Sequence, residues 1–462
     1  MEALDLIVHG DIVLPADVVQ EGVVGIRGGR IVGIFDGSWL PPHHRAIDVR
    51  GQYVLPGVID AHVHCHSTPN EGFTDATRSA ATGGVTTIIE MPYDQGRPVV
   101  SLERFADKVE LLEAESLVDV ALLATVKKTG GLDQIRPMAN AGACGFKVSL
   151  YETDPDRFPR IPDYELLQTF ALVRQAGLPI GLHCENDELV TGFAQQYRDM
   201  GADPRAHCRS RPAVVETSAV LQALEFALST GAHVHIYHAS LARSFELVEW
   251  YRRQGGRGTA ETCPHYLTLA EEDMDRLGAK GKINPPLRPA TEQAKLWALC
   301  ANGIIDQITS DHAPWLPRYK NRANIFDNAA GVPGVETLVP LIYSEGVAQG
   351  RITIHDFVRL LAEKPAKIFG LAPRKGQIRV GADADLTILD PAAEWRLDEA
   401  SLHSSAGWSP YHGWRLRGRV TRTILRGQVI FDGAEVLVSP GTGQFIPGPA
   451  GEMQRISKGA RS

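Results

Sequence analysis

The stretch "PGVIDAHVH", residues 56–64, ends a short apolar run with two histidines that lie two positions apart. Residues i and i+2 of a β-strand point to the same face, so His62 and His64 should project together from the end of this strand. Two imidazoles on one side of a strand can bind the same metal ion. Taken alone, the pattern also fits structural histidines, because backbone groups easily satisfy a neutral imidazole.

Residues 55–371 contain a repeated pattern of predicted strands and helices, which this stretch begins. Short runs rich in β-branched residues alternate with amphipathic stretches of helical length, such as residues 102–114 and 164–177. Counting the opening stretch, there are eight strand and helix pairs. This pattern predicts an α/β fold, a (β/α)8 TIM-like barrel, whose functional site lies at the carboxyl ends of the strands.

The two ends of the chain show a different pattern of short apolar runs separated by Gly and Asp turns, which is typical of short antiparallel strands. We therefore expect a small β-sandwich domain built from residues 1–54 and 372–440, with the barrel of residues 55–371 inserted between them. Residues 441–462 are rich in Gly and Pro and have no periodic pattern. They are expected to form an irregular C-terminal tail.

Composition limits the partners and the compartment. Charged residues make up 22% of the 462 residues and the formal net charge is -8, which argues against binding to nucleic acid or to an anionic membrane and favours a small-molecule substrate. The six cysteines form no CxxC pair, which is typical of a reducing compartment. Neither a signal peptide nor a long uncharged apolar stretch is present, so a cytoplasmic protein is expected.

Residue types that bind metals recur at the ends of other predicted strands. His183 ends "PIGLH", His238 ends "HVHIYH" and Asp311 ends "DQITSD". Imidazole and carboxylate together suit zinc or a similar divalent ion. Including His62 and His64, five such groups at the ends of four strands favour a metal site over scattered structural histidines.

Lys147 ends the fourth predicted strand, in the apolar run "GFKVSL". Burial there favours the neutral amine over the charged ammonium. A lysine that extends its ammonium to solvent would explain the same position. In the alternative interpretation, the neutral amine reacts with CO2 to form a carbamate, whose two oxygens could bridge two metal ions.

The order of these motifs resembles that of the amidohydrolase superfamily, in the cyclic amidase branch of allantoinases, hydantoinases, dihydropyrimidinases and dihydroorotases. "PGVIDAHVH" resembles the first strand of that family and "GFKVSL" its strand with a carboxylated lysine. "HCEN", "YHAS", "ETCPHYL", "NPPLRP" and "SDHAP" follow in the order of the family. The resemblance covers nearly the whole chain and implies a metal-dependent hydrolase.

The resemblance implies two divalent metal ions, with zinc expected and manganese, cobalt or iron as alternatives. The implied ligands are His62, His64 and Asp311 on one ion, His183 and His238 on the other, and Lys147, as N6-carboxylysine, bridging the two. One ion would polarise an amide carbonyl, and the pair would lower the pKa of a bridging water from about 15.7 toward about 7. Asp311 would be the catalytic residue that takes the hydroxide proton and passes it to the leaving nitrogen.

Substrate contacts are also implied by the resemblance. Asn284 in "KINPPLRP" resembles the family loop that hydrogen-bonds the substrate ring, although a proline-rich connection without any role would look the same. His265 and His312 resemble motif histidines near the site. His66 stands where dihydroorotases carry an arginine for the substrate carboxylate, so dihydroorotate is disfavoured.

The identity of the cyclic amide stays open at this stage. Residues 71–92 resemble allantoinases most, but the loop after His64 is shorter than theirs. Hydantoinases carry an oxyanion-stabilising tyrosine five residues after the bridging lysine. Here residue 152 is Glu and Tyr151 comes one place early, which on a strand would turn the phenol to the other face.

We therefore expect an allantoinase-like hydrolase that converts allantoin to allantoate. The alternative is a hydantoinase, a dihydropyrimidinase or another cyclic-imide hydrolase. Outside this class, non-catalytic scaffolds of the same fold have lost metal ligands, and mononuclear deaminases usually lack the lysine on the fourth strand. Because relatives are often tetramers, a homo-oligomer, either tetramer or dimer, is expected.

Overall fold

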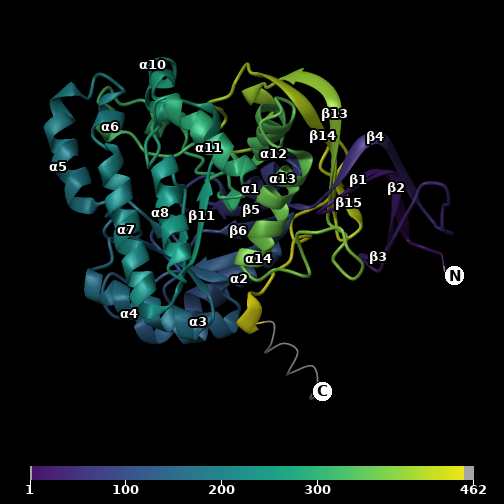
Figure 1. Cartoon of the computed structure of the whole chain (residues 1–462), viewed down its shortest axis with the longest axis horizontal. Coiled ribbons are helices and arrows are strands. Elements are labelled where there is room, and N and C mark those ends of the chain that lie inside the picture. The colour runs from purple at the N-terminus through teal and green to yellow at the C-terminus, as the bar shows by residue number, and fades with distance from the viewer. Residues whose placement is uncertain (1–2, 452–462) are drawn as a thin grey trace.

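The computed structural model describes residues 3–451 and contains two β-sheets (Figure 1). One is parallel, with its eight strands in chain order. These strands are β5 (Val58–Val63), β6 (Val85–Glu90), β7 (Asp119–Ala124), β8 (Gly145–Ser149), β9 (Pro179–His183), β10 (His233–Ile236), β11 (Arg257–Thr262) and β12 (Gln307–Ile308). Each coincides with one of the predicted runs. The barrel fold predicted from the sequence is confirmed.

The barrel closes just beyond the end of its last strand. The amide nitrogen of His64 donates to the carbonyl of His312 at 2.9 Å, and the amide of His312 donates to the carbonyl of His62 at 3.3 Å. A parallel bridge between Val63 and His312 accompanies these bonds. The first and last strands therefore meet, and the sheet is nearly a closed ring.

Helices surround this sheet and follow its strands (Figure 1). The helices of the barrel are α1 (Gly72–Thr82), α2 (Leu102–Glu115), α3 (Ile135–Ala141), α4 (Asp163–Gln175), α5 (Asp187–Tyr197), α6 (Ala206–Arg209), α7 (Ala213–Thr230), α8 (Ala242–Arg253), α9 (Pro264–Thr268), α10 (Met274–Leu277), α11 (Thr291–Ala301), α12 (Leu338–Ile342), α13 (Ile354–Val358) and α14 (Lys364–Ile368). A side-chain cap begins α2, α5 and α13. At α2, for example, the Ser101 hydroxyl accepts a hydrogen bond from the amide of Arg104, which satisfies one free N–H of the first turn.

Strands β5 to β9 are buried along their whole length. Helices cover their outer faces and side chains fill the inside of the barrel, so these strands are buried on both faces. Polar side chains cluster where the strands end. This contrast accounts for the motif pattern in the sequence.

The second sheet combines both ends of the chain, as predicted (Figure 1). Its strands are β1 (Leu6–Val13), β2 (Val18–Arg27), β3 (Arg30–Phe35), β4 (Ala46–Pro56), β13 (Leu386–Arg396), β14 (Arg415–Leu425) and β15 (Gln428–Phe431), in the order β15-β14-β13-β4-β1-β2-β3. Inward residues from both ends, such as Val8, Ile26 and Ile388, pack in one core. The expected fold class, a barrel with a small β domain from both ends, is confirmed.

The sheet is mixed and not purely antiparallel as the sequence pattern indicated. Strand β4 runs parallel to β1 and antiparallel to β13. The reason is the β2–β3 hairpin, which occupies the other side of β1. The chain has to return past β1 before it can enter β4, and this return makes the pair parallel.

The predicted tail is described only up to residue 451. Phe445 and Ile446 are buried, and the amide of Ile446 donates to the carbonyl of Val120 on β7 at 2.8 Å. This part of the tail therefore packs against the barrel without forming a strand of the sheet. Residues 452–462 lie outside the described residues.

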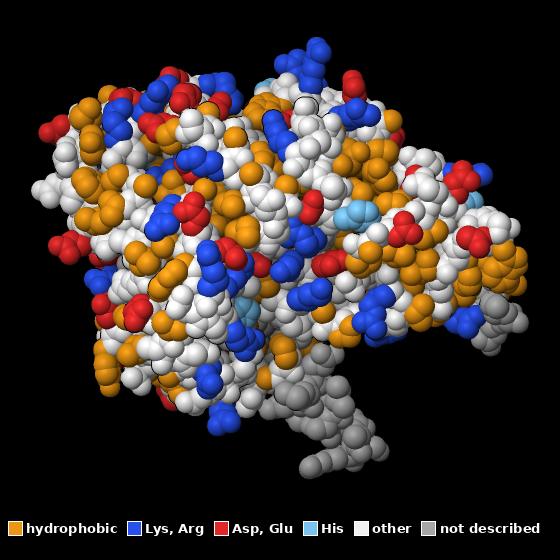
Figure 2. Space-filling model, in the orientation of Figure 1, with side chains coloured by type: hydrophobic (Ala, Val, Ile, Leu, Met, Phe, Trp, Pro, Cys, Tyr) orange, Lys and Arg blue, Asp and Glu red, His pale blue; other side chains and the backbone are white. Residues whose placement is uncertain are grey.

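Charges of both signs lie interspersed on the face in Figure 2, with hydrophobic side chains between them. Within residues 3–451, no helix is both long enough and apolar enough to cross a membrane.

A buried ion cluster joins the barrel to the small sheet. The ammonium of Lys375 lies 2.5 Å from a carboxylate oxygen of Asp119, 2.5 Å from one of Asp385 and 3.0 Å from one of Asp383. Burial alone would lower the pKa of Lys375, but these carboxylates outweigh it and raise the pKa. Asp119 begins β7, so the cluster lies at the end of the barrel opposite the strand carboxyl ends.

Replacing Lys375 by methionine should destabilise the fold, because three buried carboxylates would lose their shared cation. We expect a loss of about 3–5 kcal/mol in the free energy of unfolding, measured by urea titration followed by circular dichroism. Lys367→Met is the matched control, because Lys367 is exposed and lies 3.8 Å from Glu363. Equal urea midpoints for the two variants would contradict the structural role of Lys375.

Candidate metal centre

The six residues predicted as metal ligands lie together at the carboxyl ends of the barrel strands. His62 and Lys147 belong to β5 and β8, and His183 ends β9. His64, His238 and Asp311 follow the ends of β5, β10 and β12 by one, two and three residues. Parallel strands of a barrel present their carboxyl ends at one face, so residues far apart in sequence meet there. Lys147 is one of the six, and the other five form two groups of donors near it.

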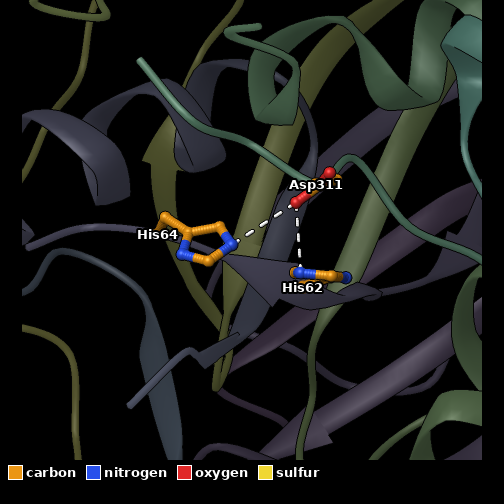
Figure 3. Close-up of side chains that lie close together, drawn as sticks. All are labelled: His62, His64 and Asp311. Atoms are coloured by element: carbon orange, nitrogen blue, oxygen red, sulfur yellow. Dashed lines mark ion pairs between the residues drawn. The ribbon is translucent and has the colours of Figure 1, made fainter. Parts of the chain in front are cut away.

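Figure 3 shows the first group, His62, His64 and Asp311. The Oδ1 atom of Asp311 lies 3.1 Å from Nε2 of His62 and 3.4 Å from Nε2 of His64. Burial raises the pKa of Asp311, and the ammonium of Lys147 opposes that rise. Two imidazole nitrogens and one carboxylate oxygen therefore converge on one point.

The second group consists of His183 and His238. Nδ1 of His183 lies 3.0 Å from Nε2 of His238, while Nε2 of His183 is bonded to Glu185 at 2.9 Å. Because Glu185 accepts the proton on Nε2, the lone pair of His183 is on Nδ1 and points toward His238. The rings of His62 and His238 are 5.3 Å apart, so the two groups adjoin.

Carboxylate and hydroxyl partners fix the orientation of the first two imidazoles. Nδ1 of His62 donates to Oε1 of Glu261 at 2.6 Å, and Nδ1 of His64 is 2.8 Å from the hydroxyl of Ser67. In both rings Nε2 is left facing the centre. Burial, followed by the charge of Lys147, lowers the pKa of both histidines well below the usual range.

Lys147 is enclosed by aromatic rings. Its Nζ atom lies 4.4 Å from the ring centre of Tyr237 and 5.8 Å from those of Tyr93 and Phe158, and it is 2.7 Å from Nε2 of His62. Burial lowers the pKa of the amine to about 8. The side chain does not reach solvent, so the interpretation as an extended surface lysine does not apply.

These observations show that the donor set fits divalent metal ions. Imidazoles, a carboxylate and an easily neutralised amine are the groups that zinc and similar ions prefer. In His62, His64 and His183 the second ring nitrogen is already engaged, which fixes the ring. The second acidic group of the described residues, Asp119, Asp383 and Asp385, is different because the ammonium of Lys375 contacts all three.

Two residues of the centre have unusual backbone conformations. His238 has φ 39° and Asp311 has φ 47°, both in the left-handed region that residues other than glycine rarely adopt. Each lies in the turn directly after its strand. The strain directs both side chains into the centre instead of along the strand.

A cavity of about 600 Å³ opens above these residues. Its wall includes His64, Lys147, His183, His238 and Asp311, together with Asn284. The Oδ1 atom of Asn284 is buried and has no hydrogen-bond partner among the described residues. The role of Asn284 in hydrogen-bonding the substrate ring stays a prediction.

The three histidines predicted as further substrate contacts do not line this cavity. His312 bonds through Nε2 to Glu71 at 3.1 Å and accepts backbone amides at Nδ1, so its ring is part of the framework. His265 is buried beside Tyr266, and His66 packs edge-on against Phe73. Their substrate contacts stay predictions that this geometry does not favour.

The position of Tyr151 differs from the prediction. Strand β8 ends at Ser149, so the alternation of a strand does not extend to residue 151. Tyr151 lines the cavity, and the guanidinium of Arg211 lies 5.0 Å from its ring centre. Glu152 instead pairs with Lys128. Tyr151 therefore lies on the cavity wall, although it stands one position before the place where hydantoinases carry their tyrosine.

Two buried carboxylates that support the centre were missed in the sequence. Glu261 lies in β11 and bonds His62, and Glu185 lies two residues after His183 and bonds both that histidine and Arg211. Both belong to motifs that were recognised, "ETCPHYL" and "HCEN". A carboxylate inside an apolar strand was the available signal.

Comparison with known proteins agrees with this arrangement. The model of the amidohydrolase family matches residues 53–430. The chain belongs to the amidohydrolase family. It is 37% identical to an allantoinase of Rubrobacter xylanophilus, over 96% of this chain and 98% of that protein, and 35% identical to an allantoinase of Deinococcus radiodurans, over 95% and 98%.

A solved structure is similar over nearly the same length. The L-hydantoinase (dihydropyrimidinase) from Arthrobacter aurescens superimposes with a TM-score of 0.92 at 32% identity, covering 96% of this chain and 100% of that one. Family membership and the resemblance to cyclic amidases that the motifs indicated are thereby confirmed.

Glu261→Gln should weaken metal binding, because an amide accepts the Nδ1 proton of His62 less strongly and makes Nε2 a poorer ligand. We expect about 10–100-fold weaker affinity for Zn²⁺, measured by competition with a chromophoric chelator. His233→Gln is the control. It also removes an imidazole from this sheet, but His233 begins β10, whereas the metal centre lies at the carboxyl ends of the strands. Affinity unchanged in Glu261→Gln would exclude this supporting role.

Proposed function

We propose that the chain hydrolyses a C–N bond in a cyclic ureide or amide, and that allantoin is its leading substrate. The observation that carries this proposal is the pair of donor groups around Lys147 at the floor of the cavity. Full-length similarity to allantoinases and hydantoinases supports the same reaction. The enzyme is a hydrolase that acts on cyclic amides.

We propose two divalent ions in this centre, with zinc expected and manganese, cobalt or iron as alternatives. The proposed ligands are His62, His64 and Asp311 on one ion, His183 and His238 on the other, and Lys147, as N6-carboxylysine, between them. Bound there, the ions supply Lewis acidity toward the amide carbonyl and toward water. The lowered pKa of Lys147 supports the carbamate, because a neutral amine is the form that adds to CO2.

Asp311 transfers a proton from the attacking water to the leaving nitrogen. Its raised pKa makes the carboxylate a better base than an ordinary aspartate, so it can take a proton from the attacking water. Ring opening leaves a nitrogen that needs a proton, and the same carboxyl group can donate it. Asn284 can accept a hydrogen bond from a ring N–H, and Tyr151 can donate one to the carbonyl oxygen as negative charge develops.

Hydantoinase-type hydrolysis is the second candidate. The specific observation in its favour is the phenol of Tyr151 on the cavity wall. The similarity to the L-hydantoinase from Arthrobacter aurescens also supports hydantoinase-type hydrolysis. Both candidates use one centre and one reaction, so they differ only in the ring and its substituent.

We also propose that the enzyme works in the reducing cytoplasm as a homo-oligomer, a tetramer or a dimer. All six cysteines are buried free thiols, which supports a reducing compartment. Val214 and Leu221 on α7 and Trp250 on α8 are exposed apolar side chains of the kind that oligomer contacts cover.

Asp311→Asn should abolish ring opening. Asparagine keeps an oxygen that can bind metal but cannot accept and return the proton, so a loss of about 10²–10⁴-fold in kcat is expected. The measurement is kcat for wild type and variant at equal metal content, determined by inductively coupled plasma spectrometry. Near-normal kcat at equal metal content would rule out Asp311 as the acid and base.

The substrate is tested by ring-opening rates on allantoin, hydantoin, 5-substituted hydantoins, dihydrouracil, dihydroorotate and succinimide. The enzyme is loaded with zinc or manganese in bicarbonate buffer, and product is quantified by chromatography. The highest kcat/KM is expected for allantoin. A clear preference for another ring would establish the second candidate, and no ring opening with two ions bound would refute the proposed function.

A further inference from the structure

The wall of the cavity holds more cations than the reaction uses. Besides Lys147, it includes Arg157, Arg198, Arg211 and Lys282. A cation that is partly removed from water costs free energy unless a partner compensates it. The partners of these four groups therefore indicate which of them is available to a ligand.

Two of the four pair with a carboxylate, and a third bonds backbone carbonyls only. Arg211 lies 2.6 Å from Glu185, and Arg198 pairs with Asp327. The ammonium of Lys282 donates to two backbone carbonyls, those of Phe326 and Asn328.

Arg157, like Lys282, bonds backbone carbonyls only, but its Nε and Nη2 make no hydrogen bond to the described residues. Within residues 3–451, no carboxylate lies within 4 Å of its guanidinium, and the residue is half-buried. Burial lowers the pKa of Arg157, and the nearest acidic groups, Asp154 and Asp94, only partly oppose this. Asp94 is bound to Lys108 at 2.5 Å, and Asp154 accepts the backbone amides of residues 156 and 157.

The Arg157 side chain lines this cavity and also a smaller neighbouring pocket, and one edge of its guanidinium is free. Its Nη1 atom donates to the carbonyls of Ser67 at 3.2 Å and Tyr93 at 3.3 Å, which anchors the side chain. Nε and Nη2 make no hydrogen bond to the described residues and are not buried, and the residue lines the cavity. Two parallel N–H groups in a fixed plane match the two oxygens of a carboxylate or the carbonyl of a urea.

This edge lies close to the reacting centre. Ser67, whose carbonyl holds Arg157, also holds Nδ1 of His64 through its hydroxyl. Arg157, His64, Asp311 and Phe158 all line the same cavity, so a ring bound over His64 and Asp311 would have its substituent on the side of the cavity that Ser67 and Arg157 form.

We propose that Arg157 is a specificity-determining residue that binds an acceptor oxygen on the exocyclic substituent of the ring substrate. This inference rests on the proposed function and narrows its substrate class to rings with a carboxylate or ureido substituent. A ureido carbonyl accepts the free N–H groups, and a carboxylate would in addition neutralise the charge. An apolar substituent would leave Nε and Nη2 without an acceptor.

The test compares four hydantoins that differ only at position 5: hydantoin itself, 5-propylhydantoin, allantoin with its ureido group, and hydantoin-5-acetic acid. kcat and KM are measured for wild type, Arg157→Gln, Arg157→Lys and Arg160→Gln. Arg160 is the matched control because it removes one positive charge from the same loop, where it pairs with Asp163 outside the cavity.

Wild type should prefer the two acceptor substituents. In Arg157→Gln, kcat/KM for hydantoin-5-acetic acid should fall by about 10–100-fold, mainly through KM, with a smaller fall for allantoin and little change for hydantoin. Arg157→Lys should recover part of the loss for the carboxylate only, because it keeps the charge but not the planar pair of donors. Arg160→Gln should match wild type.

Equal losses on all four rings would overturn the inference, because they would indicate a structural role through Ser67 and Tyr93. A wild-type preference for the propyl group would overturn it as well. Calorimetric binding of hydantoin-5-acetic acid and hydantoin to wild type and Arg157→Gln gives a result that does not need turnover. Binding that depends on Arg157 without ring opening would support the subsite while refuting the proposed function.

Discussion

The site depends on how the barrel closes. Backbone hydrogen bonds between the segments around His64 and His312 join strands that are about 250 residues apart in sequence. They bring the histidines of the first strand against Asp311 after the last. Strand β12 has only two residues, so closure relies on these few bonds just beyond it. The same bonds that complete the fold therefore set the distances within the first donor group.

Around the centre, one carboxylate organises several neighbours. Glu261 accepts from Nδ1 of His62 and from the side chain of Gln307, contacts His235, and accepts the backbone amide of His238. A charge buried in this way is tolerated because every oxygen lone pair faces a donor. Glu261 thus links both donor groups, and the orientation of one ring is not independent of the other.

The sequence predicts the barrel and all six candidate ligands because both follow from short-range rules. His62 and His64 are visible through the period of two, and the others stand at strand ends. The parallel pairing of β4 could not be predicted, because it depends on where the β2–β3 hairpin lies in three dimensions. Tyr151 was misplaced since local sequence does not show that β8 ends at Ser149. Arg157 was overlooked because only tertiary packing reveals that it lines the cavity without a carboxylate partner.

The construction of the small sheet from both ends of the chain has a consequence for biosynthesis. Strand β4 pairs with β1 on one side and with β13, made some 330 residues later, on the other. At a translation rate of about 5–20 residues per second, this edge stays open for about 15–70 s while the barrel is synthesised. Unpaired strand edges recruit other strands. The nascent chain therefore carries an exposed sheet edge through most of its synthesis, in a period when ribosome-bound chaperones act.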